Sequence, residues 1–513
     1  MMSIRWKPWP KKNACCPGPW KKTGCCYSNT IRDTLPDAPG KTPKVFFWRN
    51  KLNYNMSRNR LNDLDSKTYM KFLKSWFPFE TGAEASFISF FTKTLDETNH
   101  PTRIGYYPDS PVLKRAIETT GRQPVSLPDQ SDEQLHYALI DLRGKEPSFF
   151  GEGDLDAIFH NLFSRLKHRA YVTLWMNCGT DMAAHRCAWD VARQTTRWFE
   201  MKDEKIGCAG MTDNDQPYLG AQGGQLVYAF NFRHTLSAPK APASLTPPPH
   251  YPEHQWDTRL RMPLWFVLKP PPRKEKVKLH PAKYPEVLVE RFIKNFSRPD
   301  DVVFDPMSGT GSTQIAAVGC HRRGYGLELN ETFADIARLR LEQHNVQHVA
   351  AAVYTADAGH LEQVKGLPLR FDYVITSPPY WDMLNMKGAE TQKSRKEKGL
   401  PVNYSDSETD LGNCPDYATF LQRLLRIYHK VIQRLRPGGY MTVIVKNIKK
   451  KGVIYPFAWD IVDGLSDVLE PVGINFWLQD DIRLAPYGYG NAWVSNTFHQ
   501  YILTFHKPGK REV

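Results

Sequence analysis

Short buried strands alternate with amphipathic helices over residues 302–506, and this order limits the folds open to the chain. We expect strands at 302–305, 325–329, 353–357, 373–376, 440–446, 474–484 and 498–506, and helices at 312–319, 331–345, 417–435 and near 456–469. Parallel strands need crossover helices between them, so the alternation predicts an α/β fold with a mainly parallel, doubly wound sheet. Such sheets bind ligands at the carboxyl ends of their strands.

The turn after the first of these strands has the composition of a ligand cradle. Asp305 ends the strand, and glycines 309 and 311 precede the helix, where they allow a tight turn and close approach of a ligand. No Walker lysine follows, and the third glycine of the dinucleotide fingerprint is absent. Glu328 ends the next strand, where a carboxylate can accept both hydroxyls of a ribose. The pattern predicts an adenosine-bearing cofactor bound without a phosphate, and S-adenosylmethionine fits.

A second turn, TSPPY at 376–380, ends a later strand, because proline has no N–H to continue a sheet. Together with DPMSGTGST at 305–313 it resembles the amino-methyltransferases of DNA, which methylate N4 of cytosine or N6 of adenine on a Rossmann-like class I fold. That family typically shows DPFxGSGTT and (S/D/N)PP(Y/F). Residues 280–297 resemble the segment that closes over the methionine end of the cofactor. The resemblance covers about residues 257–508, and it departs at Met307, where phenylalanine is usual.

The resemblance implies how the second turn works. An exocyclic amine is a poor nucleophile, because its lone pair is delocalised into the base. If Ser377 Oγ and the Pro378 carbonyl each accept one N–H, the lone pair can point at the sulfonium methyl group for an in-line displacement. Tyr380 is expected to stack on a base flipped out of double-stranded DNA. A C5-cytosine enzyme would need a cysteine nucleophile, typically in a Pro-Cys pair. The chain contains no Pro-Cys pair.

The family's site residues carry over onto matching positions of this sequence. Asp305 is expected to hold the cofactor's ammonium group or to brace the turn, and Asp357 is a candidate partner for the adenine ring. The predicted catalytic residues are Ser377, Pro378, Pro379 and Tyr380, and the predicted cofactor-binding residues are Asp305, Pro306, Met307, Gly309, Gly311, Thr313, Glu328, Asp357, His280 and Pro281. Ser377 and the threonine before it resemble the N4-cytosine members more than the adenine members, which more often carry Asp or Asn. The sequence therefore predicts a site-specific DNA methyltransferase acting on N4 of cytosine.

The chain is expected to have four parts: a basic arm at 1–60, a degenerate methyltransferase-like domain at 61–236, a Pro-rich linker at 237–256 and the catalytic domain at 257–513. The degenerate domain is inferred from an internal duplication. Residues 136–151 match the strand and turn of SPPY, 171–179 match 440–448, and Ala188-Trp189-Asp190-Val191 matches Ala458-Trp459-Asp460-Ile461.

Two further correspondences complete the predicted duplication. Residues 103–118 echo 323–338, and Thr81–Ala85 stand where the glycine turn of a first copy would lie. Arg143–Pro147 replace SPPY, so this copy is expected to bind DNA or select the target without transferring a methyl group. That any two α/β units share such patterns is the alternative.

Positive charge is concentrated in the first 60 residues, which hold 13 Lys and Arg against two Asp. Such an arm suits contact with DNA phosphates, although a solvated tail is the simpler interpretation. Cys15, Cys16, Cys25 and Cys26 could hold zinc, but adjacent cysteine pairs do not have the usual spacing, so no metal is predicted. The polar segment 383–413, absent from the first copy, is expected either to order over DNA or to be a plain loop.

Cytoplasmic localisation is expected, because no apolar run approaches the ~20 residues of a membrane span and the first residues lack a secretory signal. Two alternatives to the cytosine enzyme stay open. One is an N6-adenine DNA or RNA methyltransferase with the same site residues. The other is a DNA-binding or sensing subunit of a restriction or defence system with little turnover, in which a partner protein would act.

Overall fold

The computed structural model describes residues 61–145, 149–150, 154–178, 182–210, 226–235, 262–268, 284–344, 350–381, 409–479 and 497–509. Residues 55–513 form one compact unit that contains two large sheets. We call residues 61–235 the first repeat and residues 262–509 the second repeat. The predicted linker and the whole of the predicted basic arm lie outside the described residues. Of the helices that the structure describes, none combines the length and apolar character that crossing a bilayer requires.

The second repeat contains an eight-stranded sheet in the order β11-β10-β9-β12-β13-β17-β16-β8. Its strands are β8 (Trp265–Val267), β9 (Val302–Asp305), β10 (Arg323–Glu328), β11 (Ala351–Thr355), β12 (Phe371–Thr376), β13 (Leu435–Val445), β16 (Glu470–Leu478) and β17 (His499–His506). Only β17 runs antiparallel to its neighbours. The predicted Rossmann-like, mainly parallel fold is confirmed.

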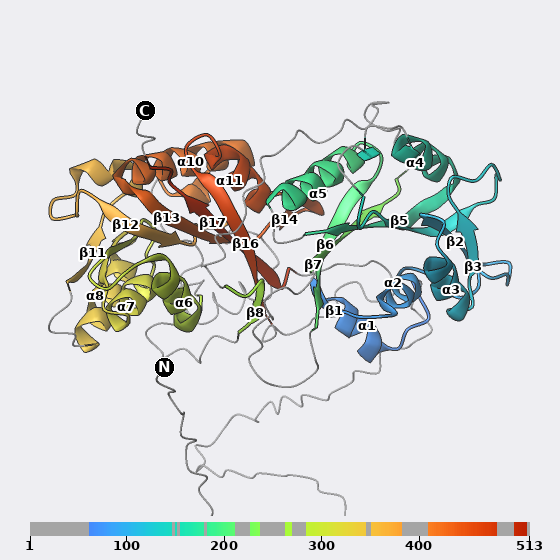
Figure 1. The fold of residues 1–513 in the computed structure, drawn as a ribbon, viewed down its shortest axis with the longest axis horizontal. Coiled ribbons are helices and arrows are strands. Elements are labelled where there is room, and N and C mark those ends of the chain that lie inside the picture. Colours follow the sequence, from blue (N-terminus) through green and yellow to red (C-terminus); the bar gives the residue numbers. More distant parts are fainter. Residues whose placement is uncertain are drawn as a thin grey trace, which may run out of the picture. The chain divides into compact units, whose positions relative to one another are not determined.

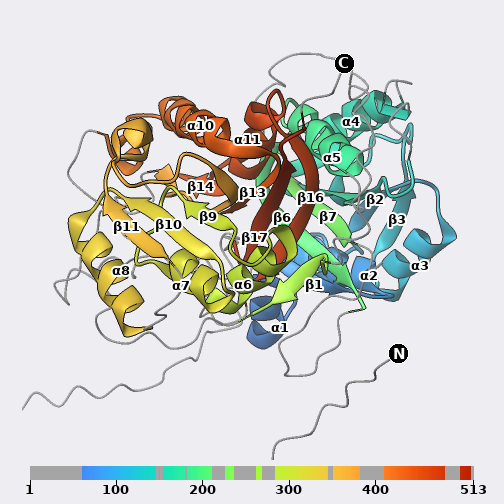
Figure 2. The ribbon, with the colours of Figure 1, turned by 60° about the vertical axis from the view of Figure 1, so that its left-hand side comes forward.

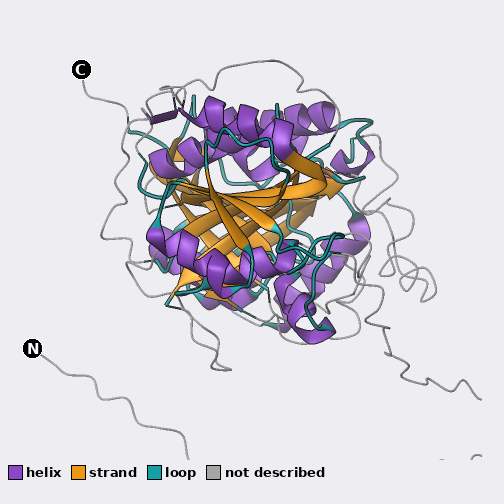
Figure 3. Ribbon diagram, turned by 90° about the vertical axis from the view of Figure 1, so that its right-hand side faces the viewer, coloured by secondary structure: helices purple, strands orange, loops and turns teal. Residues whose placement is uncertain are grey.

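Helices cover both faces of this sheet. Helices α6 (Glu286–Phe296), α7 (Ser312–Gly319) and α8 (Glu331–Gln343) lie on one face, and α10 (Tyr417–Arg434) and α11 (Phe457–Leu465) lie on the other (Figure 1). Figure 3 shows the strands between the two helical layers. Side chains start two of the helices: Asn330 accepts from the Phe333 N–H, and Asp416 accepts from the Thr419 N–H. Strand β13 begins five residues before its predicted start, because Leu435 already pairs with Phe371 ahead of a register shift.

The first repeat contains a seven-stranded sheet in the order β1-β6-β7-β5-β4-β2-β3. Its strands are β1 (Trp76–Phe79), β2 (Arg103–Tyr107), β3 (Gln123–Ser126), β4 (Leu135–Asp141), β5 (Leu166–Asn177), β6 (Glu200–Ala209) and β7 (Leu226–Arg233). Its helices are α1 (Ser66–Phe72), α2 (Ala83–Phe91), α3 (Pro111–Thr119), α4 (Asp154–Arg165) and α5 (Met182–Thr195). The strand order matches that of the second repeat, without a counterpart of β11.

Residue-level contacts support the duplication. Tyr373 donates to Thr442 Oγ1 between β12 and β13, and Tyr137 donates to Thr173 Oγ1 between β4 and β5. In each sheet these two tyrosines stand in the same register, opposite Tyr440 and Tyr171. Arg322 donates to the side chain and carbonyl of Ser297, and Arg122 donates to the same two groups of Thr92. These matched pairs favour duplication over a chance likeness between two α/β units.

Strand neighbours correct two of the predicted correspondences. Strand β2 (103–107) pairs with β4 and so matches β9, not β10, and the counterpart of the glycine turn is the segment at 107–111. The predicted Thr81–Ala85 instead begins α2, the counterpart of α6. The strand register also makes Asp141–Gly144 the counterpart of SPPY in the first repeat. This segment begins two residues before the predicted Arg143–Pro147. Sequence pattern did not separate one strand–turn–helix unit from the next.

The matched tryptophans of the two repeats meet. Trp189 of α5 and Trp459 of α11 stack with ring centroids 5.5 Å apart and an interplanar angle of 12°. Each indole donates to a tyrosine of its own repeat, Trp189 to Tyr228 at 3.1 Å and Trp459 to Tyr501 at 3.3 Å. Helices α5 and α11 lie side by side in Figures 1 and 2. Equivalent elements therefore pack against each other, as in a symmetric dimer.

Candidate active site

The predicted cofactor turn joins β9 to α7 and is organised around Asp305. This carboxyl group is fully buried and accepts from Thr313 Oγ1 at 2.6 Å, Tyr284 Oη at 3.0 Å and the Met307 N–H at 3.0 Å. Burial raises the pKa of Asp305, and these hydrogen bonds oppose the rise. Asp305 therefore braces the turn, which is one of its two predicted roles.

Glycines let the turn approach its neighbours closely. Gly309 has φ +53° and Gly311 has φ +79°, values that disfavour other residues. A Cβ on Gly311 would lie 2.9 Å from the Ala337 side chain of α8. Gly311 therefore lets the turn pack directly against α8, where a side chain would not fit.

Glu328 ends the neighbouring strand β10 and faces the same turn. Its two carboxylate oxygens accept from the Gly309 N–H at 2.8 Å and the Asn330 N–H at 2.9 Å. Burial raises the pKa of Glu328 from its ordinary value of 4.5 to about 7, although both N–H groups lower it. The predicted ribose acceptor is thus fixed beside the glycines, and each oxygen keeps a lone pair.

Gly326→Ala is expected to disrupt the cofactor turn. Its Cβ would lie 1.9 Å from Ser308 Oγ and 2.9 Å from the Asp305 carbonyl, so backbone must move. We expect a loss of about 1–3 kcal/mol of unfolding free energy, measured in urea, with weaker cofactor binding. Gly319→Ala, where the Cβ would meet nothing within 4 Å, is the matched control. Equal stability of the two variants would contradict this packing.

The SPPY turn follows β12, directly beside β9. Pairing of Val303 with Tyr373 and of Phe304 with Val374 brings the ends of the two strands, and hence Asp305 and Ser377, to the same edge of the sheet. Residues 377–380 have no regular secondary structure, and Pro378 is buried. The structure therefore brings the predicted cofactor and catalytic turns together.

Three residues that the sequence did not single out surround Tyr380. Its hydroxyl donates to Gln500 Oε1 at 3.1 Å, Lys446 Nζ lies 5.3 Å from its ring centroid, and the Phe457 ring packs edge-on at 6.5 Å. Burial raises the pKa of Tyr380 and lowers that of Lys446. Lys446 was signalled only as the first charged residue after the apolar strand YMTVIV. Gln500 carried no signal.

Two tyrosines extend the predicted site. Tyr284 lies within 280–297, the segment expected to close over the cofactor, and it reaches Asp305, whereas His280 and Pro281 lie outside the described residues. Tyr428 of α10 is fully buried, and its hydroxyl has no hydrogen-bond partner among the described residues. Burial, with smaller contributions from charge on Asp305 and on Tyr380, raises the pKa of Tyr428.

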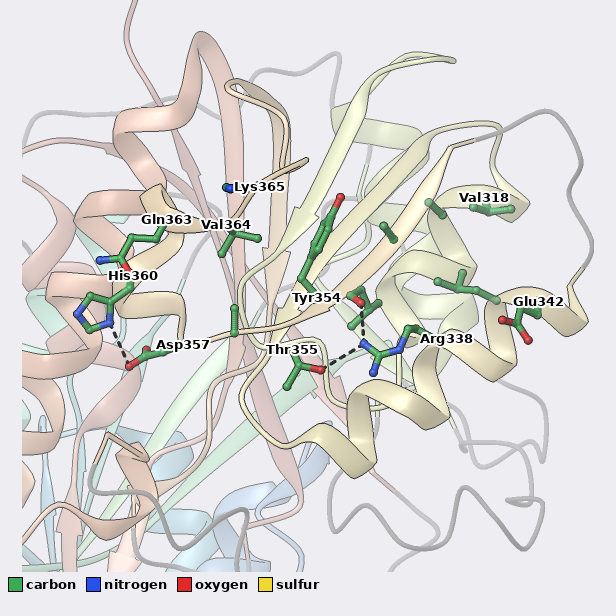
Figure 4. Close-up of a pocket in the computed structure, with 15 residues that line it drawn as sticks. Val318, Arg338, Glu342, Tyr354, Thr355, Asp357, His360, Gln363, Val364 and Lys365 are labelled. Atoms are coloured by element: carbon green, nitrogen blue, oxygen red, sulfur yellow. Dashed lines mark hydrogen bonds and ion pairs between the residues drawn. The ribbon is translucent and has the colours of Figure 1, made fainter.

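Asp357 follows Ala356, whose N–H donates to the Glu328 carbonyl at 3.0 Å, so it lies at the same edge of the sheet as Glu328. It follows β11 and starts a 3-10 helix (Ala358–Gln363) by accepting from the Gly359 N–H at 2.7 Å, and its other oxygen lies 3.4 Å from His360 Nδ1. It also borders a cavity of about 1130 Å³ along the outer edge of the sheet (Figure 4). No lining residue of that cavity belongs to either turn. The local role of Asp357 is helix capping, and its predicted contact with adenine stays a prediction.

Several expectations fall outside what the structure describes. The four cysteines at 15–26, the Lys and Arg residues of the arm, and residues 383–408 of the polar segment are among them. In the described ranges, no group of three or more His, Cys, Asp or Glu side chains is arranged to hold a metal ion.

The strand order and the two adjoining turns define a Rossmann-like methyltransferase fold. Comparison with known proteins agrees: the model of the family described as DNA methylase matches residues 171–339, and that described as N-6 DNA Methylase matches residues 281–447. Over these residues the chain is similar to the DNA amino-methyltransferase family, so the resemblance inferred from its two motifs is confirmed.

Curated relatives match short stretches. The Type II methyltransferase M.BglII of Bacillus subtilis is 38% identical over 63 residues, 12% of this chain and 18% of the relative. M.ScaI of Streptomyces caespitosus is 43% identical over 63 residues, 12% of this chain and 21% of the relative. The DNA adenine methyltransferase YhdJ of Escherichia coli (strain K12) is 31% identical over 86 residues, 16% of this chain and 29% of the relative. The chain thus spans less than a third of the length of these relatives.

Among solved structures, TrmN from Thermus thermophilus aligns with 59% of this chain and 60% of its own, at a TM-score of 0.30 and 12% identity. SMU.1697c of Streptococcus mutans, a methyltransferase solved with S-adenosylhomocysteine, aligns with 44% of this chain and 99% of its own, at a TM-score of 0.26 and 14% identity.

Proposed function

We propose that the chain is a site-specific DNA methyltransferase that transfers a methyl group from S-adenosylmethionine to the exocyclic N4 amine of a flipped-out cytosine. The observation that carries the proposal is the placement of SPPY beside the cofactor turn, on neighbouring strands with Tyr380 held from three sides. Double-stranded DNA is the proposed substrate.

The residues of the site fit the proposed cofactor. Glu328 offers a carboxylate to the ribose hydroxyls, glycines 309 and 311 give the turn its left-handed backbone, and Asp305 with Tyr284 and Thr313 forms the polar wall. The unpartnered Tyr428 hydroxyl adds a buried donor beside them. When bound, the cofactor supplies an electrophilic methyl group on a sulfonium centre.

The chain's own part in the reaction is to hold and orient the base. Ser377 Oγ and the Pro378 carbonyl each accept one N–H of the target amine, which localises the nitrogen lone pair. Tyr380 stacks on the base and compensates part of the few kcal/mol that flipping costs. Positioning and fixed dipoles supply the acceleration, and no covalent enzyme intermediate is required.

Adenine is the second candidate base. The relative YhdJ is named a DNA adenine methyltransferase, and every residue above would serve an N6 amine equally. Ser377, where adenine enzymes more often carry Asp or Asn, favours cytosine. An RNA substrate and a sensing subunit with little turnover are further alternatives.

Product analysis tests the function. The purified full chain is incubated with tritiated S-adenosylmethionine and duplex DNAs of mixed sequence. The DNA is then digested to nucleosides, which are separated by chromatography and identified by mass spectrometry. N4-methylcytosine would support the proposal, and N6-methyladenine would replace its base. Cofactor binding without label in any DNA would favour the sensor.

We also propose that the first repeat transfers no methyl group. At the position equivalent to Ser377, the first repeat carries Asp141, which forms an ion pair with Arg143 at 2.6 Å. The Arg143 guanidinium lies 4.7 Å from the Trp175 ring centroid and 3.6 Å from Glu84. These side chains occupy the space beyond the strand end, where a base would have to sit. The predicted boundaries at 61–236 and 257–513 follow the two sheets and stay a proposal.

A basic hairpin beside SPPY supports DNA as the substrate. Strands β14 (Ile448–Lys450) and β15 (Val453–Tyr455) form it, and Lys450 Nζ lies 3.7 Å from the ring centroid of Trp381, the residue after SPPY. The first repeat holds the hairpin, because Lys449 donates to the Lys202 carbonyl at 2.8 Å. Positive charge is thereby fixed next to the catalytic turn.

The double variant Lys450→Gln/Lys451→Gln is expected to weaken DNA binding and reduce its salt dependence. The slope of log K against log salt is negative, and each lost phosphate contact reduces its magnitude by about 0.9. We therefore expect the double variant to reduce the magnitude by ~2. Fluorescence anisotropy with a labelled duplex at several salt concentrations measures it. Lys294→Gln, an exposed lysine of α6, should leave the slope unchanged. An unchanged slope in the double variant would show that the hairpin does not contact DNA phosphates.

A further inference from the structure

The first repeat inserts one buried carboxylate into the second. Glu204 of β6 is 5% exposed, and its oxygens accept from Asn447 Nδ2 at 2.8 Å and from Tyr501 Oη. His499 Nε2 lies 3.8 Å from the same group. All three partners belong to the second repeat. A buried carboxylate is costly unless it is hydrogen-bonded, so these contacts fix both sides of the junction.

The residues that Glu204 holds are sequence neighbours of those that touch Tyr380. Asn447 follows Lys446, whose ammonium lies against the Tyr380 ring, and Tyr501 follows Gln500, which accepts from the Tyr380 hydroxyl. Successive side chains of an extended segment point to opposite sides. Each of the two segments therefore presents one side chain to Glu204 and the next to Tyr380.

The third contact of Tyr380 depends on Glu204 as well. Asn447 Oδ1 accepts from the Ala458 N–H at 3.0 Å and so fixes the first turn of α11. Phe457, the residue before Ala458, packs edge-on against the Tyr380 ring. All three groups around Tyr380 are thus one residue away from a group in the hydrogen-bond network of Glu204.

The network is not symmetric, although the repeats are. Glu204 stands opposite Phe230 on β7, and the residue at the same register of the second repeat is Ile474, opposite Leu503. The counterpart of Asn447 is Cys178. Glu204 of the first repeat thus contacts the second repeat, which carries SPPY. The equivalent residue of the second repeat, Ile474, has no carboxylate to make the reciprocal contact.

We infer that Glu204 is a positioning residue for Tyr380, so that the first repeat is a working part of the active site of the second. The inference rests on the proposed function. It gives the first repeat a role in transfer that does not require it to bind cofactor or DNA.

Glu204→Gln in the full chain tests the inference, with Glu200→Gln as the matched control. Glu200 lies on the same strand but is exposed, and its ion pairs among the described residues are with Lys202 and Arg233 of its own repeat. We expect Glu204→Gln to lower kcat about tenfold, with the dissociation constant for S-adenosylmethionine unchanged, because no cofactor residue touches Glu204. Tyr501→Phe, which removes one donor and keeps the ring, should lower kcat similarly, and the double variant should be no worse than either single variant.

A second readout needs no turnover. 3-Fluorotyrosine placed at position 380 reports its surroundings by its ¹⁹F resonance, which Glu204→Gln should shift or broaden and Glu200→Gln should not. If Glu204→Gln fails to fold, both kcat and the ¹⁹F resonance are measured on Tyr501→Phe instead. If the folded variants keep the wild-type resonance, the inference is wrong, whatever the activity. If the wild type transfers no methyl group to any DNA, the proposed function fails, and the resonance still decides the positioning role.

Discussion

Ser377→Ala is expected to lower kcat for methyl transfer by about 10²–10³-fold. The hydroxyl is one of two acceptors proposed for the target amine, and removal of one preorganised polar contact from a site of this kind typically has an effect of this size. The serine lies next to buried Pro378 and beyond the last residue of β12, so its loss should not disturb the sheet. Single-turnover transfer from tritiated cofactor to duplex DNA measures the rate.

The control for Ser377→Ala is Ser164→Ala, an exposed serine of the first repeat whose hydroxyl donates to the Asn161 carbonyl. Both variants should bind S-adenosylmethionine as the wild type does. A Ser377→Ala protein with the wild-type rate would exclude the proposed role of the hydroxyl. If Ser377→Ala kept the chain's biological effect while losing transfer, the sensing subunit would be the better account.

Local pattern was enough to predict most elements of the second repeat, but not the short strands β8, β14 and β15. The bounds of β9 and α7 agree with those expected, because an apolar strand, a glycine turn and a helix start each depend on residues adjacent in sequence. The two turns were found for the same reason. Proline fixes φ where it stands, and glycine permits backbone conformations that other residues avoid, so their positions carry information without knowledge of the fold.

Contacts between distant residues were not accessible to this reasoning. Tyr380 and Gln500 are 120 positions apart, and Glu204 and Asn447 are 243 apart. Nothing near Gln500 or Glu204 indicates a partner, and only pairing of β13 with β17 and packing of the repeats brings them together. Strand β2 was matched to β10 instead of β9 for the same reason, because neighbours in a sheet are not neighbours in sequence.

Cofactor affinity is expected to rise about tenfold between pH 6 and pH 8, because Glu328 must be ionised to accept both ribose hydroxyls. With its pKa at about 7, roughly a tenth of the groups are ionised at pH 6 and nine tenths at pH 8. The sign for the unliganded fold is opposite. A pKa raised above that of the unfolded chain makes the fold less stable as pH rises from 4.5 to about 7.

Calorimetric titration of S-adenosylmethionine at pH 6, 7 and 8 measures the affinity. In buffers of different ionisation enthalpy at pH 7 it should also show net proton release, because hydrogen bonds from the ribose favour the carboxylate. Glu328→Gln should bind about 100-fold more weakly with a flat profile, since its amide N–H₂ would face a backbone N–H. Glu331→Gln, at the exposed start of α8, should behave as the wild type. A flat wild-type profile would show that Glu328 is already ionised at pH 6 or does not hold the ribose.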